Sequence, residues 1–390
     1  MSDPTPTITG LIHHPYLPPS NWAAVAPGVF KASTVMFPNV AALRARSWKS
    51  RDGYTYGLHG SPTSFTLEER LATLEGGSHC VLAPSGLAAI AMVNVALLKA
   101  GDEVLLPDNV YGPSKEMART LLADWGVTHR FYDPMDPADL DAKIGPHTRL
   151  VWLEAPGSVT MEFPDLLGLI AVARRRGVLT ALDNTWGAGL AIRAFDLGVD
   201  ISMHALTKYP SGGGDVLMGS VVTCDTDLHH RILQAHMRLG IGVGANDVEF
   251  ILRGLPTIEL RYRAHDAAAR ELAQWLAGQP HISRVLHPAL PGAPGHAHWK
   301  ATCTLAAGLL SVLIDPQLPS ARVDAFCDAL KLFKMGYSWG GPVSLVVPYD
   351  LAAMRDDRTA LPGHLVRFSI GLEAVADLKA DLAQALQMLA

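Results

Sequence analysis

Two segments of the sequence place an acidic and a basic side chain where they could serve one ligand. Asp183 ends an apolar run that predicts a buried strand, and Lys208 follows a second apolar segment about 25 residues later. Ligands of open α/β sheets bind at the carboxyl ends of strands, so Asp183 is a candidate for pairing with a cation. A desolvated lysine amine is a nucleophile and a base. Taken singly, Asp183 could be only a helix cap and Lys208 only a surface lysine.

A third segment could hold a phosphate. Ser85-Gly86-Leu87 joins a predicted strand to a predicted apolar helix, and the start of a helix offers free N–H groups and positive dipole charge. By itself the glycine could merely permit the turn. Together the three segments meet the needs of pyridoxal phosphate (PLP), which are a carboxylate for the pyridine nitrogen, an amine for a Schiff base and a phosphate site. Tyr111, after another predicted strand, could stack on the pyridine ring.

The elements that must position these residues alternate between strands and helices. Apolar strands separated by helices predict a mainly parallel sheet covered on both faces, and hence an α/β fold. The predicted strands are 80–83, 103–106, 150–153 and 178–182, and the predicted helices are 67–74, 86–98, 113–125 and 166–176. A long helical stretch, 247–276, is interrupted near Gly254. Strands at 309–314 and 366–370 and helices at 323–332 and 375–389 follow it and predict a smaller α/β domain.

The chain therefore divides into three predicted parts: an irregular N-terminal arm (1–62), a large cofactor-binding domain (63–255) and a C-terminal domain (256–390). Its 390 residues exceed what one hydrophobic core usually serves. A net charge of −5 gives no basic surface for nucleic acid. The longest apolar stretch is too short to cross a membrane and no signal peptide is seen, so we expect a cytoplasmic protein. The four cysteines show no CxxC pair, which predicts reduced thiols.

Two other classes of site share single features with this sequence. A dinucleotide-dependent oxidoreductase could use a glycine-rich loop, but no GxGxxG follows the first strand and the pair Asp183 and Lys208 would have no role. A metal site could use His229-His230 or His296-Ala297-His298, but a solvated helix face and a surface loop explain these histidines. We therefore expect no metal.

Ordered motifs lie over almost the whole chain. The motifs are Tyr54-Thr55-Tyr56-Gly57, Leu74-Glu75-Gly76-Gly77, Pro84-Ser85-Gly86-Leu87-Ala88-Ala89, Glu154-Ala155-Pro156-Gly157-Ser158, Leu182-Asp183-Asn184-Thr185-Trp186, Thr207-Lys208-Tyr209, Tyr337-Ser338-Trp339-Gly340-Gly341 and Arg367-Phe368-Ser369-Ile370-Gly371-Leu372-Glu373. In these motifs the chain resembles the Cys/Met-metabolism family of fold-type I PLP-dependent enzymes, and within it the bacterial cystathionine β-lyases.

The resemblance implies a role for each matching residue. Lys208 would carry the cofactor and move protons, Asp183 would pair with the pyridine nitrogen and Tyr111 would stack on the ring; these three are the candidate catalytic residues. The substrate α-carboxylate would lie at Arg367, flanked by Ser338 and Trp339. The full set of candidate cofactor-binding residues is Tyr56, His59, Ser85, Gly86, Leu87, Tyr111, Asp183, Ala205, Thr207 and Lys208.

The resemblance also implies the fold, the assembly and the reaction. The fold would have a mainly parallel seven-stranded sheet, and the assembly would be a homotetramer, a dimer of dimers with shared sites. The expected reaction is β-elimination of cystathionine to homocysteine, pyruvate and ammonia, in methionine biosynthesis, with cystine or other cysteine S-conjugates as further substrates. Trp339 and Gly157-Ser158 favour β-elimination, because γ-enzymes usually carry other residues at these positions. A γ-lyase and a γ-synthase-type transferase are the alternatives.

One position departs from the family pattern. Relatives commonly place an arginine two residues after the tyrosine that matches Tyr56, where it reaches the phosphate in a neighbouring subunit. Here that residue is Leu58, which has no donor. The next residue, His59, could supply the missing hydrogen bond; alternatively Leu58 only packs at the subunit interface and the helix start at Gly86 suffices.

Overall fold

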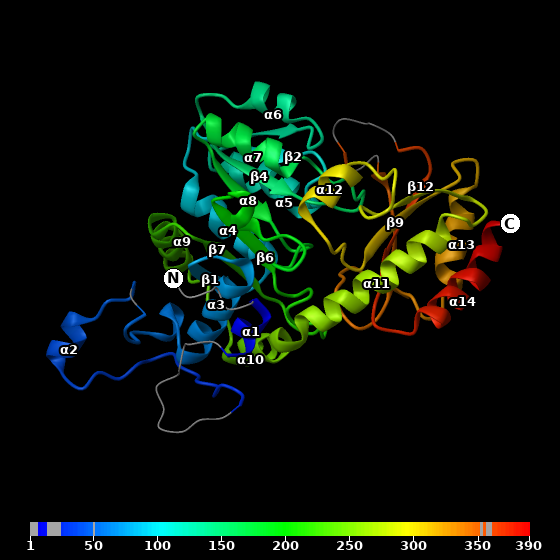
Figure 1. Ribbon diagram of the computed structural model, residues 1–390. Helices are drawn as coiled ribbons and strands as arrows, with labels where there is room; N and C mark the ends of the chain where they lie inside the picture. Colours follow the sequence, from blue (N-terminus) through cyan, green and yellow to red (C-terminus); the bar gives the residue numbers. More distant parts are fainter. Residues whose placement is uncertain (1–6, 14–24, 50, 352–353, 356–360) are drawn as a thin grey trace.

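The computed structural model contains two β-sheets of unequal size and describes residues 7–13, 25–49, 51–351, 354–355 and 361–390 (Figure 1). The larger sheet has seven strands in the order β1-β7-β6-β5-β4-β2-β3. They are β1 (His79–Ala83), β2 (Glu103–Pro107), β3 (Thr128–Tyr132), β4 (Thr148–Glu154), β5 (Leu179–Asp183), β6 (Ile201–Ala205) and β7 (Gly219–Thr223). Strand β7 is antiparallel to both neighbours and all other pairs are parallel. The prediction of a mainly parallel sheet is confirmed.

Helices cover both faces of this sheet because its strands are apolar on both sides. In β4, Leu150 and Trp152 belong to one buried cluster, whereas Val151 and Leu153 belong to another. Helices α4 (Gly86–Leu97) and α9 (Thr226–Leu239) contribute to the first cluster. The second cluster takes residues from α3 (Pro62–Glu75), α7 (Leu166–Arg175), α8 (Ala194–Leu197) and α10 (Ala245–Gly254). A short helix, α6 (Pro137–Lys143), packs against α7 and β3.

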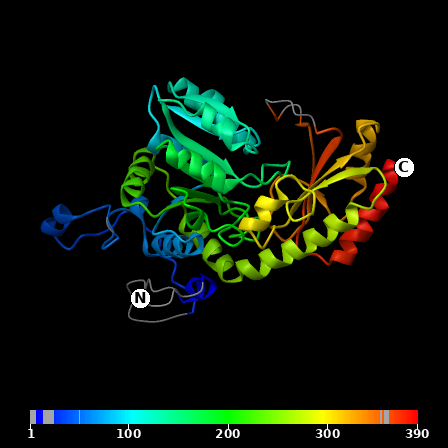
Figure 2. The ribbon, with the colours of Figure 1, turned by 45° about the horizontal axis from the view of Figure 1, so that its top comes forward.

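The smaller sheet has five strands in the order β10-β11-β12-β9-β8. They are β8 (Ile282–Leu286), β9 (Leu309–Ile314), β10 (Lys334–Met335), β11 (Leu345–Tyr349) and β12 (His364–Ser369). Its core is closed by α11 (Ile258–Leu276), α13 (Ser320–Ala329) and α14 (Val375–Ala385), with the 3-10 turn Leu386–Leu389 after α14 and α12 (His296–Thr302) before β9. Figures 1 and 2 show α11 running from the larger sheet to the smaller one. The domain boundary at 255/256 stays a prediction.

The N-terminal segment departs in part from the expectation of an irregular, coreless arm. Helix α1 (Thr7–Ile12) packs against α3, and its Leu11 is fully buried in the core of the larger sheet. In contrast, α2 (Val40–Ala45) buries none of its residues and projects from the body in both views (Figures 1 and 2). Residues 1–6, 14–24 and 50 of the predicted arm lie outside the described residues.

Several predicted boundaries were wrong for local reasons. The helix predicted from Leu67 begins at Pro62, because Ser61 and Ser64 form a reciprocal capping box. The helix predicted over 113–125 is instead α5 (Gly112–Met117) followed by a π-helical turn (Ala118–Leu122). The interruption predicted near Gly254 is confirmed, as a 3-10 turn at Leu255–Thr257.

The remaining global expectations concern cysteines and membranes. All four cysteines are free thiols; Cys80, Cys303 and Cys327 are buried and Cys224 is exposed. Within the described ranges, no helix combines the length and apolar character needed to span a bilayer.

Candidate active site

A cavity lies at the carboxyl ends of the parallel strands of the larger sheet. Every predicted site residue except Tyr56 and His59 lines this cavity. The predicted residues that line it are Ser85, Gly86, Leu87, Tyr111, Asp183, Ala205, Thr207, Lys208, Ser338, Trp339 and Arg367. Most of them follow the strands β1, β2, β5 and β6, which end at one edge of the sheet, and the last three come from the smaller sheet and the loop beside it.

Lys208 lies between the two sheets with its amine facing the loop after β10. Its Nζ donates a 2.8 Å hydrogen bond to Ser338 Oγ and lies 5.3 Å from the ring centre of Trp339. Burial and, secondarily, the charge of Arg367 lower the pKa of Lys208 to about 8, against the opposing effect of Asp183. Such an amine is neutral often enough at neutral pH to act as a nucleophile or base.

Two carboxylates lie side by side in this cavity. Asp183, at the end of β5, is opposite Glu154, at the end of β4. Burial raises the pKa of Asp183, although hydrogen bonds from Thr185 oppose the rise. Burial, with the negative charge of Asp183, raises the pKa of Glu154 well above its usual range. Two desolvated carboxylates at the ends of neighbouring strands favour a bound cation or proton between or beside them.

Glu154 was missed as a site residue. Its Oε2 accepts a 2.8 Å hydrogen bond from the backbone N–H of Tyr111, so it fixes the start of the loop that carries the predicted stacking residue. The sequence signal was present, because Glu154 ends an apolar strand in the same way as Asp183. Tyr349 and Met354 also line the cavity, but nothing in their local sequence pointed there.

The start of α4 leaves backbone donors at the cavity. Ser85 Oγ accepts from the N–H of Ala88 at 3.0 Å and Ser85 O accepts from Ala89, so the N–H groups of Gly86 and Leu87 have no partner among the described residues. A Cβ on Gly86 would lie 2.6 Å from the Cβ of Ala205, so only glycine lets these segments approach.

Thr207, the other residue predicted near the phosphate, lines the same cavity. Its hydroxyl lies within hydrogen-bond distance of the Met218 backbone, 3.3 Å from O and 3.2 Å from N. A hydroxyl has one proton and two lone pairs, so Thr207 can donate to a phosphate only by giving up its hydrogen bond to Met218 O.

Arg367 lines the cavity from β12. Its residue surface is 8% exposed, and its Nε has no hydrogen-bond partner in the described part of the chain. The guanidinium lies 5.1 Å from the ring centre of Tyr349, and burial lowers its pKa. A buried guanidinium with an unmet donor suits a carboxylate ligand, which it can bind through two hydrogen bonds.

Tyr56 and His59 lie apart from this cavity. His59 Nδ1 is 2.9 Å from Thr55 Oγ1, its ring contacts Trp48 and Tyr56, and burial lowers its pKa. His59 and Leu58 line a second cavity, beside the N-terminal segment. Because Tyr56 and His59 were expected to reach the cofactor of a neighbouring subunit, their roles stay predictions.

The prediction that His229 lies on a solvated helix face is wrong, because this residue is buried on α9. Its ring stacks on that of His79 with ring centres 4.4 Å apart, and His296 Nδ1 lies 2.9 Å from Pro288 O. No group of three or more potential metal ligands occurs in the part of the chain that the structure describes.

Comparison with known proteins agrees with this geometry. The family model of the Cys/Met metabolism PLP-dependent enzymes matches residues 8–387. The chain belongs to this family. A putative cystathionine β-lyase of Rhizobium johnstonii is 42% identical over 92% of this chain and 90% of the relative. The cystathionine β-lyase MetC of Escherichia coli is 37% identical over 92% of each chain. The solved structure of metB from Corynebacterium glutamicum is 29% identical, with a TM-score of 0.91 over 99% of each chain.

A member of this family of PLP-dependent enzymes needs a place for that cofactor, and the cavity fits it. The amine of Lys208, the carboxylate of Asp183 and the N–H groups of Gly86 and Leu87, which no described residue engages, are the three kinds of group that PLP requires. Because Gly86 approaches Ala205 closely and has no side chain, the cavity wall at this point carries no side-chain bulk.

Proposed function

We propose that this chain is a PLP-dependent carbon–sulfur β-lyase that converts cystathionine and water to homocysteine, pyruvate and ammonia. The observation that carries the proposal is the meeting of Lys208, Asp183 and the buried Arg367 in one cavity. The relatives named cystathionine β-lyase, which match over nine-tenths of both chains, support the same reaction. Such an enzyme would serve methionine biosynthesis.

Each residue has a task in this reaction. Asp183 would hold the pyridine nitrogen, the N–H groups of Gly86 and Leu87 would hold the phosphate, and Tyr111 would cover the ring. When bound, PLP supplies an electron sink for the negative charge that remains on the substrate α-carbon after proton removal.

The substrate would be oriented between Arg367 and Lys208. Arg367 would bind the α-carboxylate through its fork of donors, with Trp339 beside it. Lys208 Nζ would accept the α-proton, and Ser338 Oγ, 2.8 Å away, would hold that amine in place. β-Elimination requires a base only for the α-proton, and Lys208 can supply it, whereas γ-elimination must also remove a proton from the β-carbon.

We also propose the finer points of assembly and location. The exposed apolar residues of the N-terminal segment, among them Met36, Val40 and Leu43, support docking of this segment on a neighbouring subunit. A homotetramer with shared sites would cover them and would bring Tyr56 and His59 to a partner's cofactor. Free thiols support a reducing, cytoplasmic location. Cystine and other cysteine S-conjugates are further expected substrates.

The test is to identify the keto acid formed from L-cystathionine by the purified, PLP-loaded enzyme. Pyruvate with homocysteine is the expected result. Formation of 2-oxobutyrate with cysteine would reassign the chain as a γ-lyase, and thioether synthesis from an activated homoserine ester would make it a transferase.

A further inference from the structure

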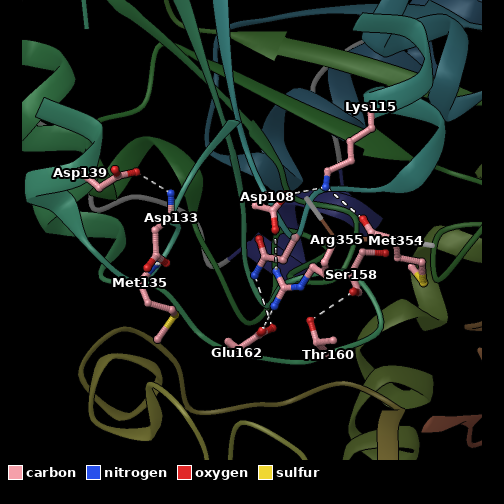
Figure 3. A network of polar contacts seen from close by, with 11 residues as sticks. Asp108, Lys115, Asp133, Met135, Asp139, Ser158, Thr160, Glu162, Met354 and Arg355 are labelled. Atoms are coloured by element: carbon pink, nitrogen blue, oxygen red, sulfur yellow. Dashed lines mark hydrogen bonds and ion pairs between the residues drawn. The ribbon is translucent and has the colours of Figure 1, made fainter. Parts of the chain in front are cut away.

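Two consecutive residues after β11 are tied to the larger sheet by a cluster of charged side chains (Figure 3). The Arg355 guanidinium forms an ion pair with Glu162, and its Nη1 lies 3.9 Å from Asp108 Oδ2. Lys115 Nζ donates to Asp108 Oδ1 at 2.6 Å and to the backbone carbonyl of Met354 at 3.0 Å. Both the backbone of Met354 and the side chain of Arg355 are therefore held.

This cluster is withdrawn from water and balanced in charge. The side chains of Asp108 and Lys115 are each 4% exposed, and those of Glu162 and Arg355 are 12% and 13% exposed. Buried ion pairs add little net stability compared with apolar packing, but the loss of one partner leaves a costly unpaired charge. The cluster is therefore better suited to fixing the position of this segment than to stabilising the fold.

The charged cluster lies beside one wall of the candidate active-site cavity, the wall that carries Tyr111 and Ser158. Asp108 precedes Tyr111 by three residues and Lys115 follows it by four. Glu162 is linked to the same wall, because Asn109 Nδ2 donates to Glu162 at 3.4 Å and Asn109 O accepts from the N–H of Ser158 at 2.8 Å. Met354 lines the cavity together with Tyr111 and Ser158.

We propose that Met354 determines specificity for the group attached to the substrate sulfur, and that Arg355 is the positioning residue that holds Met354 against the cavity. This inference rests on the proposed function and names a determinant of its substrate range. With the α-carboxylate at Arg367 and the α-carbon near Lys208, the sulfur substituent must follow another wall. Met354, whose backbone carbonyl accepts a hydrogen bond from Lys115 Nζ, offers an apolar surface there.

An apolar wall favours the carbon chain of the sulfur substituent. Lys208 and Arg367 are the lysine and arginine among the described residues that line the cavity, and both have other tasks, so we expect Met354 to contact the carbon atoms of that chain. A methionine side chain is unbranched and polarisable and adapts to a flexible thioether chain.

The test compares substrates of increasing bulk. The ratio of kcat/KM for S-benzyl-L-cysteine to that for S-methyl-L-cysteine is measured by pyruvate release for the wild type, Met354→Ala, Arg355→Gln and Arg355→Lys. Removal of the Met354 side chain should raise this ratio about tenfold, as expected for a few methylene groups in an apolar pocket. Arg355→Gln should also raise this ratio of kcat/KM values. Arg355→Lys should keep a ratio close to that of the wild type, because lysine keeps the positive charge.

A second readout does not require turnover. L-Norleucine has an unbranched apolar side chain and no leaving group, and its Kd for the PLP-loaded protein is measured by calorimetry. Met354→Ala should raise this Kd about tenfold relative to that of L-alanine. The matched controls are Met388→Ala and Arg263→Gln, which remove an exposed methionine and an exposed ion pair on other elements and should change neither quantity.

The outcomes separate this inference from the proposed function. If both the kcat/KM ratio and the norleucine Kd of Met354→Ala stay within twofold of the wild type, the inference is overturned, even if Arg355→Gln fails to fold. If the wild type releases no pyruvate from L-cystathionine, the proposed function fails, whereas the norleucine Kd still decides whether Met354 contacts the side chain.

Discussion

Lys208 Nζ donates a 2.8 Å hydrogen bond to Ser338 Oγ, and this contact joins the residue that follows β6 to the loop after β10. Ser338 has a φ of 107°, which is rare for a residue with a side chain and costs about 1–3 kcal/mol. Strain of this kind persists only where the surrounding structure imposes it. The lysine is thus held by a serine whose own backbone is constrained by its surroundings.

The buried amine should make the stability of the apoprotein depend on pH. The pKa of Lys208 falls to about 8 in the folded chain, below its ordinary value of 10.5, so its charge opposes folding below pH 8. Lys208→Met should therefore stabilise the apoprotein at pH 7, by on the order of 3 kcal/mol at most. As pH rises from 8 to about 10.5 the unfolded chain loses this proton as well, and the advantage should vanish. Denaturant unfolding of the wild-type and Lys208→Met apoproteins between pH 7 and about pH 10.5 measures this difference in the free energy of unfolding. A difference that does not change with pH would contradict the buried-amine account.

Lys208→Ala should abolish turnover and remove the visible absorption of the lysine-bound cofactor. PLP should still bind through its phosphate, since the N–H groups of Gly86 and Leu87 are unaffected. Absorption spectroscopy and a pyruvate assay check this, with the exposed Lys300→Ala as a control that should behave like the wild type. An unchanged visible spectrum in Lys208→Ala would show that another group carries the cofactor.

Asp183→Asn should bind PLP but lose several orders of magnitude in kcat. An amide cannot keep the pyridine nitrogen protonated, so the cofactor becomes a poor electron sink. Steady-state kinetics with cystathionine measure the loss, and Asp227→Asn, an exposed residue on α9, is the matched control. Near wild-type activity of Asp183→Asn would remove Asp183 from the mechanism.

Replacement of His59 should test how this chain manages without the usual arginine at position 58. If His59 supplies a donor to the phosphate in a neighbouring subunit, His59→Ala should raise the Kd for PLP several-fold. The effect should grow at mildly acidic pH, where the imidazole is charged; burial lowers the pKa of His59 and moves this growth to lower pH.

The converse variant, Leu58→Arg, should tighten PLP binding by roughly ten- to a hundredfold, because a hydrogen bond to a charged group contributes about 1.5–3 kcal/mol. The PLP affinities of His59→Ala and Leu58→Arg are each measured by titration of the apoprotein with PLP. An unchanged affinity of His59→Ala over the whole pH range would mean that Leu58 only packs and that the start of α4 suffices.

The sequence predicted those parts of the fold whose signals are local. Strands β1, β2, β4 and β5 are short apolar runs next to helices, and Asp183 and Lys208 stand where such strands meet ligands. Strand β3 was not predicted because exposed residues interrupt it, and β7 because its small residues, Gly219 and Ser220, resemble a loop.

The rest of the site depends on contacts between distant segments. Arg367 and Ser338 came from the family resemblance, because nothing in their local pattern shows that β12 and the loop after β10 face the larger sheet. Met354 could not be found at all, since its place depends on Lys115 and Arg355, which are charged residues that a sequence would assign to the surface.

Cystathionine with ¹³C in its three-carbon, cysteine-derived half tests the central claim most directly. Mass spectrometry of the products formed by the PLP-loaded enzyme shows which carbon–sulfur bond is broken. The account predicts that the label appears in pyruvate and that homocysteine is unlabelled. Label recovered in cysteine, beside unlabelled 2-oxobutyrate, would contradict it.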